Sequence, residues 1–227
     1  MASPSNYRQP QPNNFLSKTF ALAAIVRQHH AQDRSIIPLI GGDDPNTGKR
    51  PALSTWKPYQ SRLTTPSEID TWLAEGLSAY GVVCGQISGI IVLDIDDSDV
   101  AAAFARRFPR LMKTYTVRSG LRGTPHIYWR VDFPVKSQSI LGGDLKAEGS
   151  YVVGAGSEIA GRVWQVENDT PIRPITRSEL ERVLAVLRPA PQMISTVLVE
   201  GSESEKAPIN TSPPHQHNVR GELVTNL

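Results

Sequence analysis

Short apolar runs of strand length follow one another through the middle of the chain, and only a few residues separate most neighbours. Parallel strands need a crossover connection of about a dozen residues or more, whereas antiparallel strands can be joined by a tight turn. The chain therefore favours an α+β fold with a mainly antiparallel central sheet over a doubly wound parallel sheet. The expected strands lie at residues 79–85, 89–96, 114–119, 126–131, 151–155 and 162–166.

The first two of these runs are joined only by the three residues "QIS". This connection is too short for a parallel crossover but long enough for a turn. We therefore expect residues 79–85 and 89–96 to pair with each other as an antiparallel hairpin.

Helices are expected on both sides of this strand-rich region. Apolar residues at helical spacing predict one helix over about residues 16–27. Capping boxes at residues 65–68 and 176–179 predict the starts of two more. Ser98 can cap a fourth, which runs to about Phe108. With a strand-like run at residues 35–42, the first two helices predict an N-terminal α/β portion, so the sheet is expected to be flanked by helices.

The bulk properties of the 227-residue chain exclude several classes of protein. One cysteine, Cys84, excludes a disulfide framework or a multi-cysteine zinc site and suits a reducing compartment. No apolar run approaches the roughly 18 residues that indicate a membrane span. We therefore expect a cytoplasmic protein with no membrane partner. Its expected parts are a flexible N-terminus (residues 1–13), a folded domain (14–190) and a disordered tail or linker (191–227).

An acidic cluster ends the most apolar run, "GIIVLDIDDSD". Side chains alternate faces along a strand, so Asp94 and Asp96 point the same way, about 7 Å apart. Two such carboxylates can bind a hard divalent cation, although a solvated strand end has the same pattern. Asp97 and Asp99 are expected at the start of the next helix, where the helix dipole favours negative charge.

Two further stretches carry polar side chains of interest. In "HIYWRV", alternation places His126, Tyr128 and Arg130 on one face, where the imidazole and the guanidinium could bind phosphate oxygens. A surface histidine beside an ordinary arginine fits this stretch equally. Asp144 follows two glycines, and Lys146 lies two residues later, on the same face of an extended segment. Asp144 could carry chemistry with Lys146, or it could be a simple turn residue.

Positive charge is concentrated between residues 106 and 146. This segment has nine Lys/Arg against two acidic residues, Asp132 and Asp144, a local net charge of +7. Such a segment is typical either of an ordinary solvated surface or of a surface that binds along a nucleic-acid backbone.

The order of these pieces resembles the archaeo-eukaryotic primase superfamily, and most closely its bifunctional primase/polymerase branch from plasmids, phages and mobile elements. The resemblance spans about residues 36–166. It is carried by "GKRPALSTWKPYQ", "IDTWLAEG", "YGVVCGQISGIIVLDID" and "GGDLKAEGSYVVGAGS". The chain departs from the family pattern in "GTPH", which lacks the Gly-Gly pair that often precedes the histidine. It also departs in "GAGS", where many relatives have a proline pair.

The resemblance implies an RRM-like catalytic core and a DNA-directed nucleotidyltransferase, a DNA primase and/or DNA polymerase. Its substrates would be dNTPs or NTPs and a single-stranded DNA template, and its cofactor Mg²⁺ or Mn²⁺. The implied catalytic residues and metal ligands are Asp94, Asp96 and Asp144. The expected nucleotide-binding residues are His126, Arg130, Lys146, Arg118, Ser119 and Thr124. The expected template-binding residues are Lys49, Lys57, Arg106, Arg107, Lys113 and Arg122.

Two other functions remain open at this stage. A phosphatase of the haloacid dehalogenase type also places Asp-x-Asp after a strand, but Asp97 and Ser98 follow here instead of that family's pattern. A non-catalytic nucleic-acid-binding replication module would use the acidic cluster only structurally. A helicase domain or partner beyond the C-terminal tail would fit a role in DNA replication.

Overall fold

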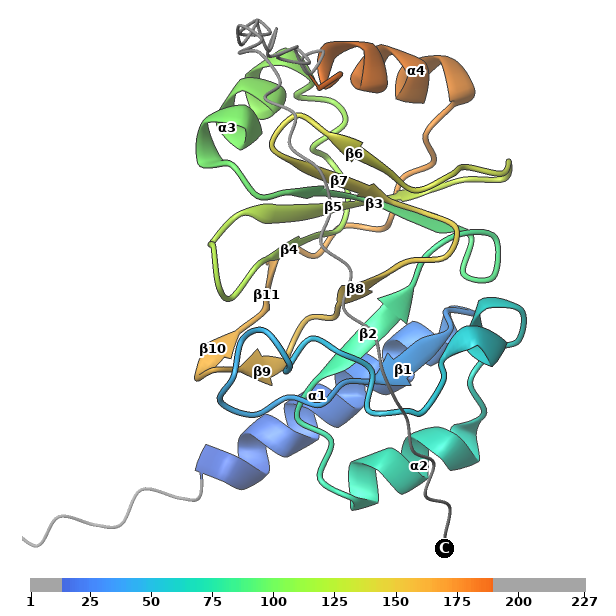
Figure 1. Cartoon of the computed structure of the whole chain (residues 1–227), viewed down its shortest axis with the longest axis vertical. Coiled ribbons are helices and arrows are strands. Elements are labelled where there is room, and N and C mark those ends of the chain that lie inside the picture. The colour runs from blue at the N-terminus through green and yellow to red at the C-terminus, as the bar shows by residue number, and fades with distance from the viewer. Residues whose placement is uncertain (1–13, 190–227) are drawn as a thin grey trace, which may run out of the picture. The chain divides into compact units, whose positions relative to one another are not determined.

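Six strands form the central sheet of the structure, a computed structural model that describes residues 14–189. The expected flexible N-terminus and the disordered tail or linker lie outside the described residues. The strand order is β11-β4-β5-β3-β7-β6, and every neighbouring pair is antiparallel, which confirms the mainly antiparallel central sheet (Figure 1). The strands are β3 (Ile90–Ile95), β4 (Thr116–Arg118), β5 (Pro125–Arg130), β6 (Gln138–Ile140), β7 (Gly143–Lys146) and β11 (Gln165–Asn168).

Both faces of this sheet are covered, which explains why β3 is apolar along most of its length. Leu93 and Ile95 face a core formed with the helices α3 (Ser98–Arg107) and α4 (Arg177–Val186), which lie above the sheet in Figure 1. Val92, on the opposite face of β3, packs into a second core. Because side chains alternate along a strand, Asp94 lies on the same face as Val92.

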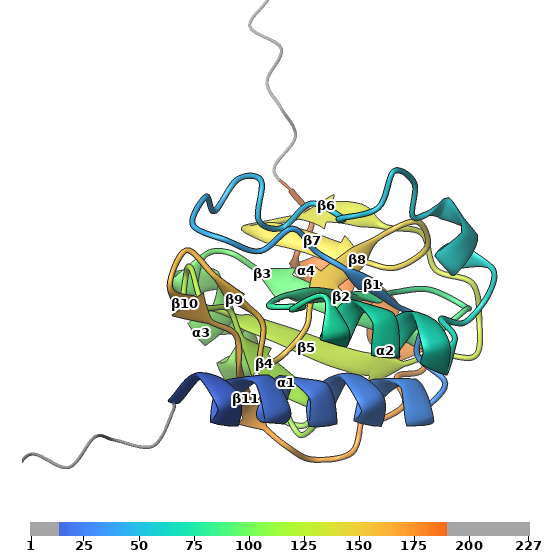
Figure 2. The same cartoon turned by 90° about the horizontal axis from the view of Figure 1, so that it is seen from below.

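A smaller sheet lies against that second face. Its strand order is β1-β2-β8, and α1 and α2 lie next to each other in this half of the structure, as Figure 2 shows. This half contains the N-terminal α/β portion that the sequence predicts. The elements are α1 (Asn14–Ala31), β1 (Ile36–Pro38), the 3₁₀-helix η1 (Lys57–Gln60), α2 (Pro66–Ala74), β2 (Tyr80–Val83) and β8 (Tyr151–Val153), followed by the hairpin of β9 (Glu158–Ile159) and β10 (Arg162–Val163).

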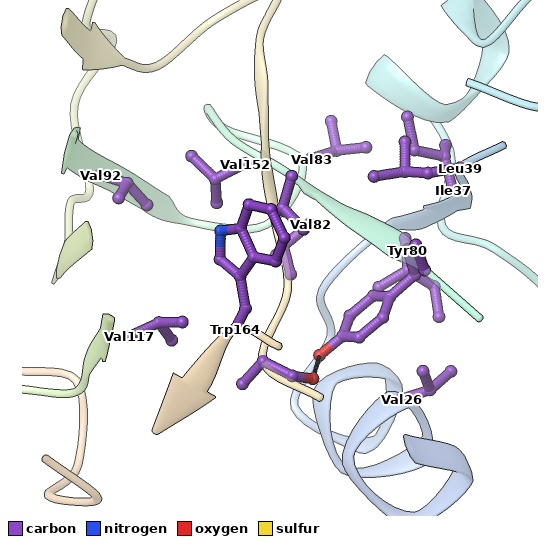
Figure 3. Close-up of a cluster of buried hydrophobic side chains, with 14 of the residues drawn as sticks. Val26, Ile37, Leu39, Tyr80, Val82, Val83, Val92, Val117, Val152 and Trp164 are labelled. Atoms are coloured by element: carbon purple, nitrogen blue, oxygen red, sulfur yellow. Dashed lines mark hydrogen bonds between the residues drawn. The ribbon is translucent and has the colours of Figure 1, made fainter. Parts of the chain in front are cut away.

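The core between the two sheets is centred on Trp164. Its indole lies among valines from several strands, including Val92 of β3 and Val152 of β8 (Figure 3). The buried Tyr80 hydroxyl donates a hydrogen bond of 3.1 Å to the carbonyl of Ala155, which satisfies its polar end inside this core. The segment around Trp164 thus joins the two sheets.

The expected hairpin between residues 79–85 and 89–96 is wrong. Only Gly85 and Ile90 bridge each other, with Gly85 N–H donating to the Ile90 carbonyl at 2.8 Å. Beyond this turn the strands diverge into different sheets, where β2 pairs with β1 and β8, and β3 pairs with β5 and β7. Both edges of each strand are therefore occupied by other partners, and neither edge is left for the hairpin.

The helix starts follow their capping signals closely. Thr65 and Thr176 each form the capping box that the sequence predicts. The cap of α3 is Asp97 instead of the expected Ser98, and its carboxylate accepts hydrogen bonds from the N–H groups of Asp99 and Val100 at 2.8 and 3.0 Å. Within residues 14–189, no helix is both long and apolar enough to cross a membrane.

Candidate active site

Three polar residues that are distant in sequence lie side by side across neighbouring strands. Asp94 on β3 is directly opposite Asp144 on β7 and directly opposite His126 on β5. Residues paired in this way have Cβ atoms about 4.5–5.5 Å apart and project from the same face of the sheet. The row Asp144–Asp94–His126 therefore lies on the face that is turned toward the smaller sheet.

This row opens into a cavity of about 500 Å³ between the two sheets. The 40s–50s segment, the β4–β5 turn and β8 close its sides. The lining residues are Lys49, Trp56, Asp94, Asp96, Ser119, Arg122, His126, Asp144, Lys146, Gly149, Ser150, Tyr151, Val152, Val153 and Trp164. Acidic side chains at the base and basic side chains around them therefore share one solvent-accessible space.

Each of the three carboxylates has a basic partner. Asp94 Oδ1 lies 3.2 Å from His126 Nε2, and Asp144 Oδ2 accepts a hydrogen bond of 2.7 Å from Lys146 Nζ. Asp96 forms an ion pair with Arg122. The negative charge that ends β3 thus meets basic side chains from β5, β7 and the β4–β5 turn.

Asp94 is the most enclosed of the three, with a side chain 19% exposed, compared with 44% for Asp96 and 39% for Asp144. Burial alone would raise the pKa of Asp94. The hydrogen bond from His126 and the charges of His126, Lys146 and Lys49 outweigh it and hold the pKa below its usual value. Asp94 is therefore ionised at neutral pH despite its position.

His126 is almost completely buried, and its two ring nitrogens have different surroundings. Nε2 faces Asp94, which can only accept, so the proton is expected on this nitrogen. Nδ1 is buried and has no hydrogen-bond partner among the described residues. The ring is thus fixed on one side and leaves an unsatisfied polar atom on the other.

Two glycines bring β7 against β3 at this point. Gly142 has a φ of +69°, and its carbonyl accepts a hydrogen bond of 2.7 Å from the N–H of Asp96. A Cβ on Gly143 would lie only 2.1 Å from the carbonyl oxygen of Asp94. The turn before β7 therefore needs glycine for the close approach that sets Asp144 beside Asp94.

Comparison with known protein families assigns the chain to one of them. The family described as bifunctional DNA primase/polymerase, N-terminal, matches residues 27–181, which is well over half of the chain. The chain belongs to this family. A comparison with curated proteins gave no match. Membership indicates a DNA primase/polymerase function at the level of the family, with DNA and nucleotides as substrates.

The family match includes every residue of the row and all of the residues expected to bind the nucleotide or the template. Besides Asp96, four further residues singled out from the sequence of this primase/polymerase domain line the same cavity. Lys146 and Ser119 were expected at the nucleotide, whereas Lys49 and Arg122 were expected at the template. Lys49 thus lies close enough to Asp94 to help lower its pKa, and Arg122 forms an ion pair with Asp96.

Other expected nucleotide-binding residues of the primase/polymerase domain do not line this cavity. Arg130 follows His126 by four residues on β5 and lines a different cavity. Arg118 forms an ion pair with Glu167 of β11. Thr124 is buried, and its hydroxyl has no hydrogen-bond partner among the described residues.

The remaining expected template residues are dispersed. Arg106 and Arg107 line an apolar groove between α3 and α4, on the opposite side of the sheet from Asp94. Lys57 is exposed on η1, and Lys113 is exposed in the loop before β4. The basic segment of the sequence therefore does not form one continuous lining of the site.

Aromatic residues of the cavity were not predicted from the sequence. Trp56 and Tyr151 meet edge to face with ring centroids 5.2 Å apart, and Lys49 Nζ lies 5.9 Å from the centre of the Trp164 ring. The Tyr151 hydroxyl donates to the carbonyl of Lys49 at 2.9 Å, which ties β8 to the 40s loop. The presence of Lys49 and Trp56 in one quoted family stretch, "GKRPALSTWKPYQ", was the available signal.

The carboxylates of the primase/polymerase domain can be tested for their fit to a metal ion. In the part of the chain that the structure describes, no three His, Cys, Asp or Glu side chains converge into a ready metal cage. Each carboxylate instead points toward its own basic partner. By chemistry the set does fit: adjacent carboxylates in an open cavity are the ligands that Mg²⁺ and Mn²⁺ prefer.

Proposed function

We propose that this chain is a metal-dependent nucleotidyltransferase that synthesises primers, extends DNA on a single-stranded template, or does both. The observation that carries the proposal is the register that puts Asp144, Asp94 and His126 in one row at the base of one cavity. Family membership supports the reaction class, and the row supplies side chains suited to it.

Asp94 and Asp144, with Asp96 at the end of the same strand, would hold Mg²⁺ or Mn²⁺. When bound, the metal would neutralise the charge that develops on the attacking and leaving oxygens of a phosphoryl transfer. The low pKa of Asp94 supports this assignment, since a ligand of this kind must be ionised.

The basic residues of the cavity would bind the triphosphate. Lys146, Arg122 and His126 each contact a carboxylate now, and phosphate oxygens offer these donors the same kind of acceptor. Lys49 adds a further positive charge near Asp94. We therefore propose that these side chains exchange their carboxylate partners for phosphate oxygens when the nucleotide and the metal enter together.

The cavity also has a wall suited to a base. Trp56 and Tyr151 present aromatic surface next to the charged row, and bases stack on such rings whatever their identity. We propose that this wall receives the base of the incoming nucleotide or of the template strand.

The finer parts of the assignment are also proposals. We take the sheet around β3, β5 and β7 to be the RRM-like catalytic core expected from the resemblance. A role in replicating a plasmid, phage or mobile element inside the cytoplasm, with a helicase as partner, would be consistent with a primase/polymerase. These suggestions rest on the family.

A non-catalytic nucleic-acid-binding module is the second candidate. The observation in its favour is that Asp94, Asp96 and Asp144 each already have a basic partner, as they would in a purely structural cluster. A phosphatase is less favoured, because the family match points to DNA synthesis.

A priming assay tests the main proposal. Unprimed single-stranded DNA is incubated with the full chain, labelled dNTPs or NTPs, and Mg²⁺ or Mn²⁺, and a primed template is run in parallel. We expect labelled strands on at least one template, and none when EDTA is added.

Mn²⁺ titration separates the alternatives. Nucleotide affinity should rise with Mn²⁺ in the wild type, should rise much less in Asp94→Ala, and should rise normally in Asp99→Ala. Nucleotide affinity that ignores both the metal and Asp94→Ala would favour the non-catalytic module. Steady hydrolysis of a simple phosphomonoester would favour the phosphatase.

A further inference from the structure

A second polar cavity, of about 560 Å³, lies at the other end of the β3–β5 pair. Arg130, which lines it, is four residues from His126 along β5 and is paired with Ile90 at the start of β3. At about 3.3 Å per residue, this is about 13 Å from the Asp94 row. None of the residues that line this cavity lines the candidate active site.

Arg34, at the side of this cavity, is a half-buried guanidinium without a carboxylate partner. Its Nη1 donates a hydrogen bond of 2.7 Å to His29 Nδ1, and no ion pair joins it to any residue of the described range. Burial lowers the pKa of Arg34, and the hydroxyl groups of Tyr128, Tyr115 and Tyr80 offset only part of this effect. A cation that has been taken out of water in this way is left with uncompensated charge.

His29 does not supply the missing negative charge. It is 3% exposed, and burial followed by the charge of Arg34 lowers its pKa to about 3. Arginine has no acceptor, so the Nδ1 atom that faces it must be unprotonated. His29 is therefore a neutral acceptor that orients Arg34 and leaves the remaining guanidinium donors free.

Arg130 adds a second positive charge from β5. Its backbone is fixed, because its N–H donates to Arg173 and its carbonyl accepts from Ile175. Its exposed guanidinium has no hydrogen bond or ion pair with another described residue. Two guanidinium groups from different elements thus share one cavity, and neither has an anion.

We propose that this cavity binds a phosphate group at a site separate from the active site. Guanidinium groups present fixed pairs of donors that match phosphate oxygens, and Gln28 and Gln32 add amide groups on the α1 side. The volume is in the range of small-molecule sites. Asp169 is the single carboxylate among the lining residues, so it disfavours a second anionic group and can accept from a hydroxyl.

The phosphate has two possible sources with the same chemistry. It can belong to a free nucleoside monophosphate, whose sugar hydroxyls suit Asp169. It can also be the terminal phosphate of a nucleic-acid strand. The experiment below separates these sources.

Calorimetric titration of the full chain at low salt with EDTA present tests the proposal. The probes are inorganic phosphate, dAMP, and a short single-stranded oligonucleotide with and without a 5′-phosphate. We expect saturable phosphate binding that Arg130→Gln weakens about tenfold or more, since a hydrogen bond between charged groups is lost. Arg162→Gln, which removes an exposed arginine outside both cavities, should leave it unchanged.

Further variants show in which of the two cavities the phosphate binds. Arg34→Lys keeps the charge but loses the paired donors, so it should also weaken phosphate binding while far-UV circular dichroism stays native. Tighter binding of dAMP than of phosphate supports the nucleotide source, and a preference for the 5′-phosphorylated oligonucleotide supports the strand end. Absence of saturable binding overturns the proposal. Binding that Lys146→Gln abolishes and Arg130→Gln leaves intact also overturns it, because the phosphate then sits in the active-site cavity.

Discussion

At the scale of single residues, the acidic cluster that ends β3 divides into two pairs with different tasks. Asp94 and Asp96 line the candidate active site. Asp97 caps α3, and Asp99 lies in its first turn, as expected for charges that favour a helix N-terminus. Four neighbouring carboxylates are therefore compatible because two meet basic side chains, Asp97 accepts from backbone N–H groups, and Asp99 lies where the helix dipole favours negative charge.

Asp144→Asn tests the row most directly. It keeps the shape of the side chain but removes a charge proposed to hold the metal. We expect primer extension to fall about a hundredfold or more, because losing even a group that only orients a metal ligand typically costs 10–100-fold. Asp99→Asn, which removes the same charge from outside the cavity, is the matched control. Extension by Asp144→Asn at the wild-type rate would show that Asp144 is not a ligand.

His126→Gln tests the proposed phosphate contact. The variant should raise KM for the nucleotide about tenfold and change kcat less, because the ring is proposed to bind the ground state and the transition state alike. Steady-state kinetics with varied nucleotide concentration measure this. An unchanged KM with a large loss of kcat would instead indicate that His126 acts in the chemical step.

At the scale of elements, the site depends on how β7 meets β3. Asp144 reaches Asp94 only because Gly142 and Gly143 let the turn pass close to the β3 backbone. Gly142 therefore makes the unusual turn before Asp144, and Gly143 permits the close approach to β3.

Gly143→Ala tests this dependence. The added methyl group would collide with the Asp94 carbonyl, so we expect a loss of about 2–3 kcal/mol in the free energy of unfolding, together with reduced activity. Urea denaturation measures the loss. Gly123→Ala is the control, because a Cβ there meets no atom within 4 Å and only its φ of +71° is unfavourable, at about 1 kcal/mol. Equal losses in both variants would contradict the close approach.

At the scale of the whole molecule, buried polar groups join α1 to the strands. His29 on α1 lies against Tyr80 of β2 and against Tyr115, which directly precedes β4, with ring centroids 5.9 and 6.0 Å from its own. This histidine is neutral and buried, so protonating it requires the packing between α1 and both sheets to open.

His29 predicts how stability depends on pH. Its pKa is about 3 in the folded chain and 6.5 in the reference state, so between these values only the unfolded chain takes up the proton. Stability is thus greatest above pH 6.5 and falls toward pH 3, by up to about 1.4 kcal/mol per pH unit from this group. Urea denaturation from pH 7 to pH 4 should show a smaller acid loss in His29→Gln than in the wild type. Identical slopes would show that His29 is not buried as a neutral group.

Local patterns in the sequence predicted the features that depend only on residues within one helix or strand. Alternation placed Asp94 with Asp96 and placed His126 with Arg130 on common faces, and capping boxes placed the helix starts, because these features depend on neighbouring residues along the chain. Composition and strand spacing similarly indicated an antiparallel α+β fold.

Only the tertiary structure decided which strands are partners and in what register. It separates β2 from β3 despite their short connection, sets Asp144 beside Asp94, and places Arg130 in a different cavity from His126. Strand pairing is chosen by the burial of both sheet faces and by contacts between distant segments, and neither is a property of a local stretch. The sequence by itself therefore determined the chemistry available at each position, and long-range packing decided which of those groups share a site.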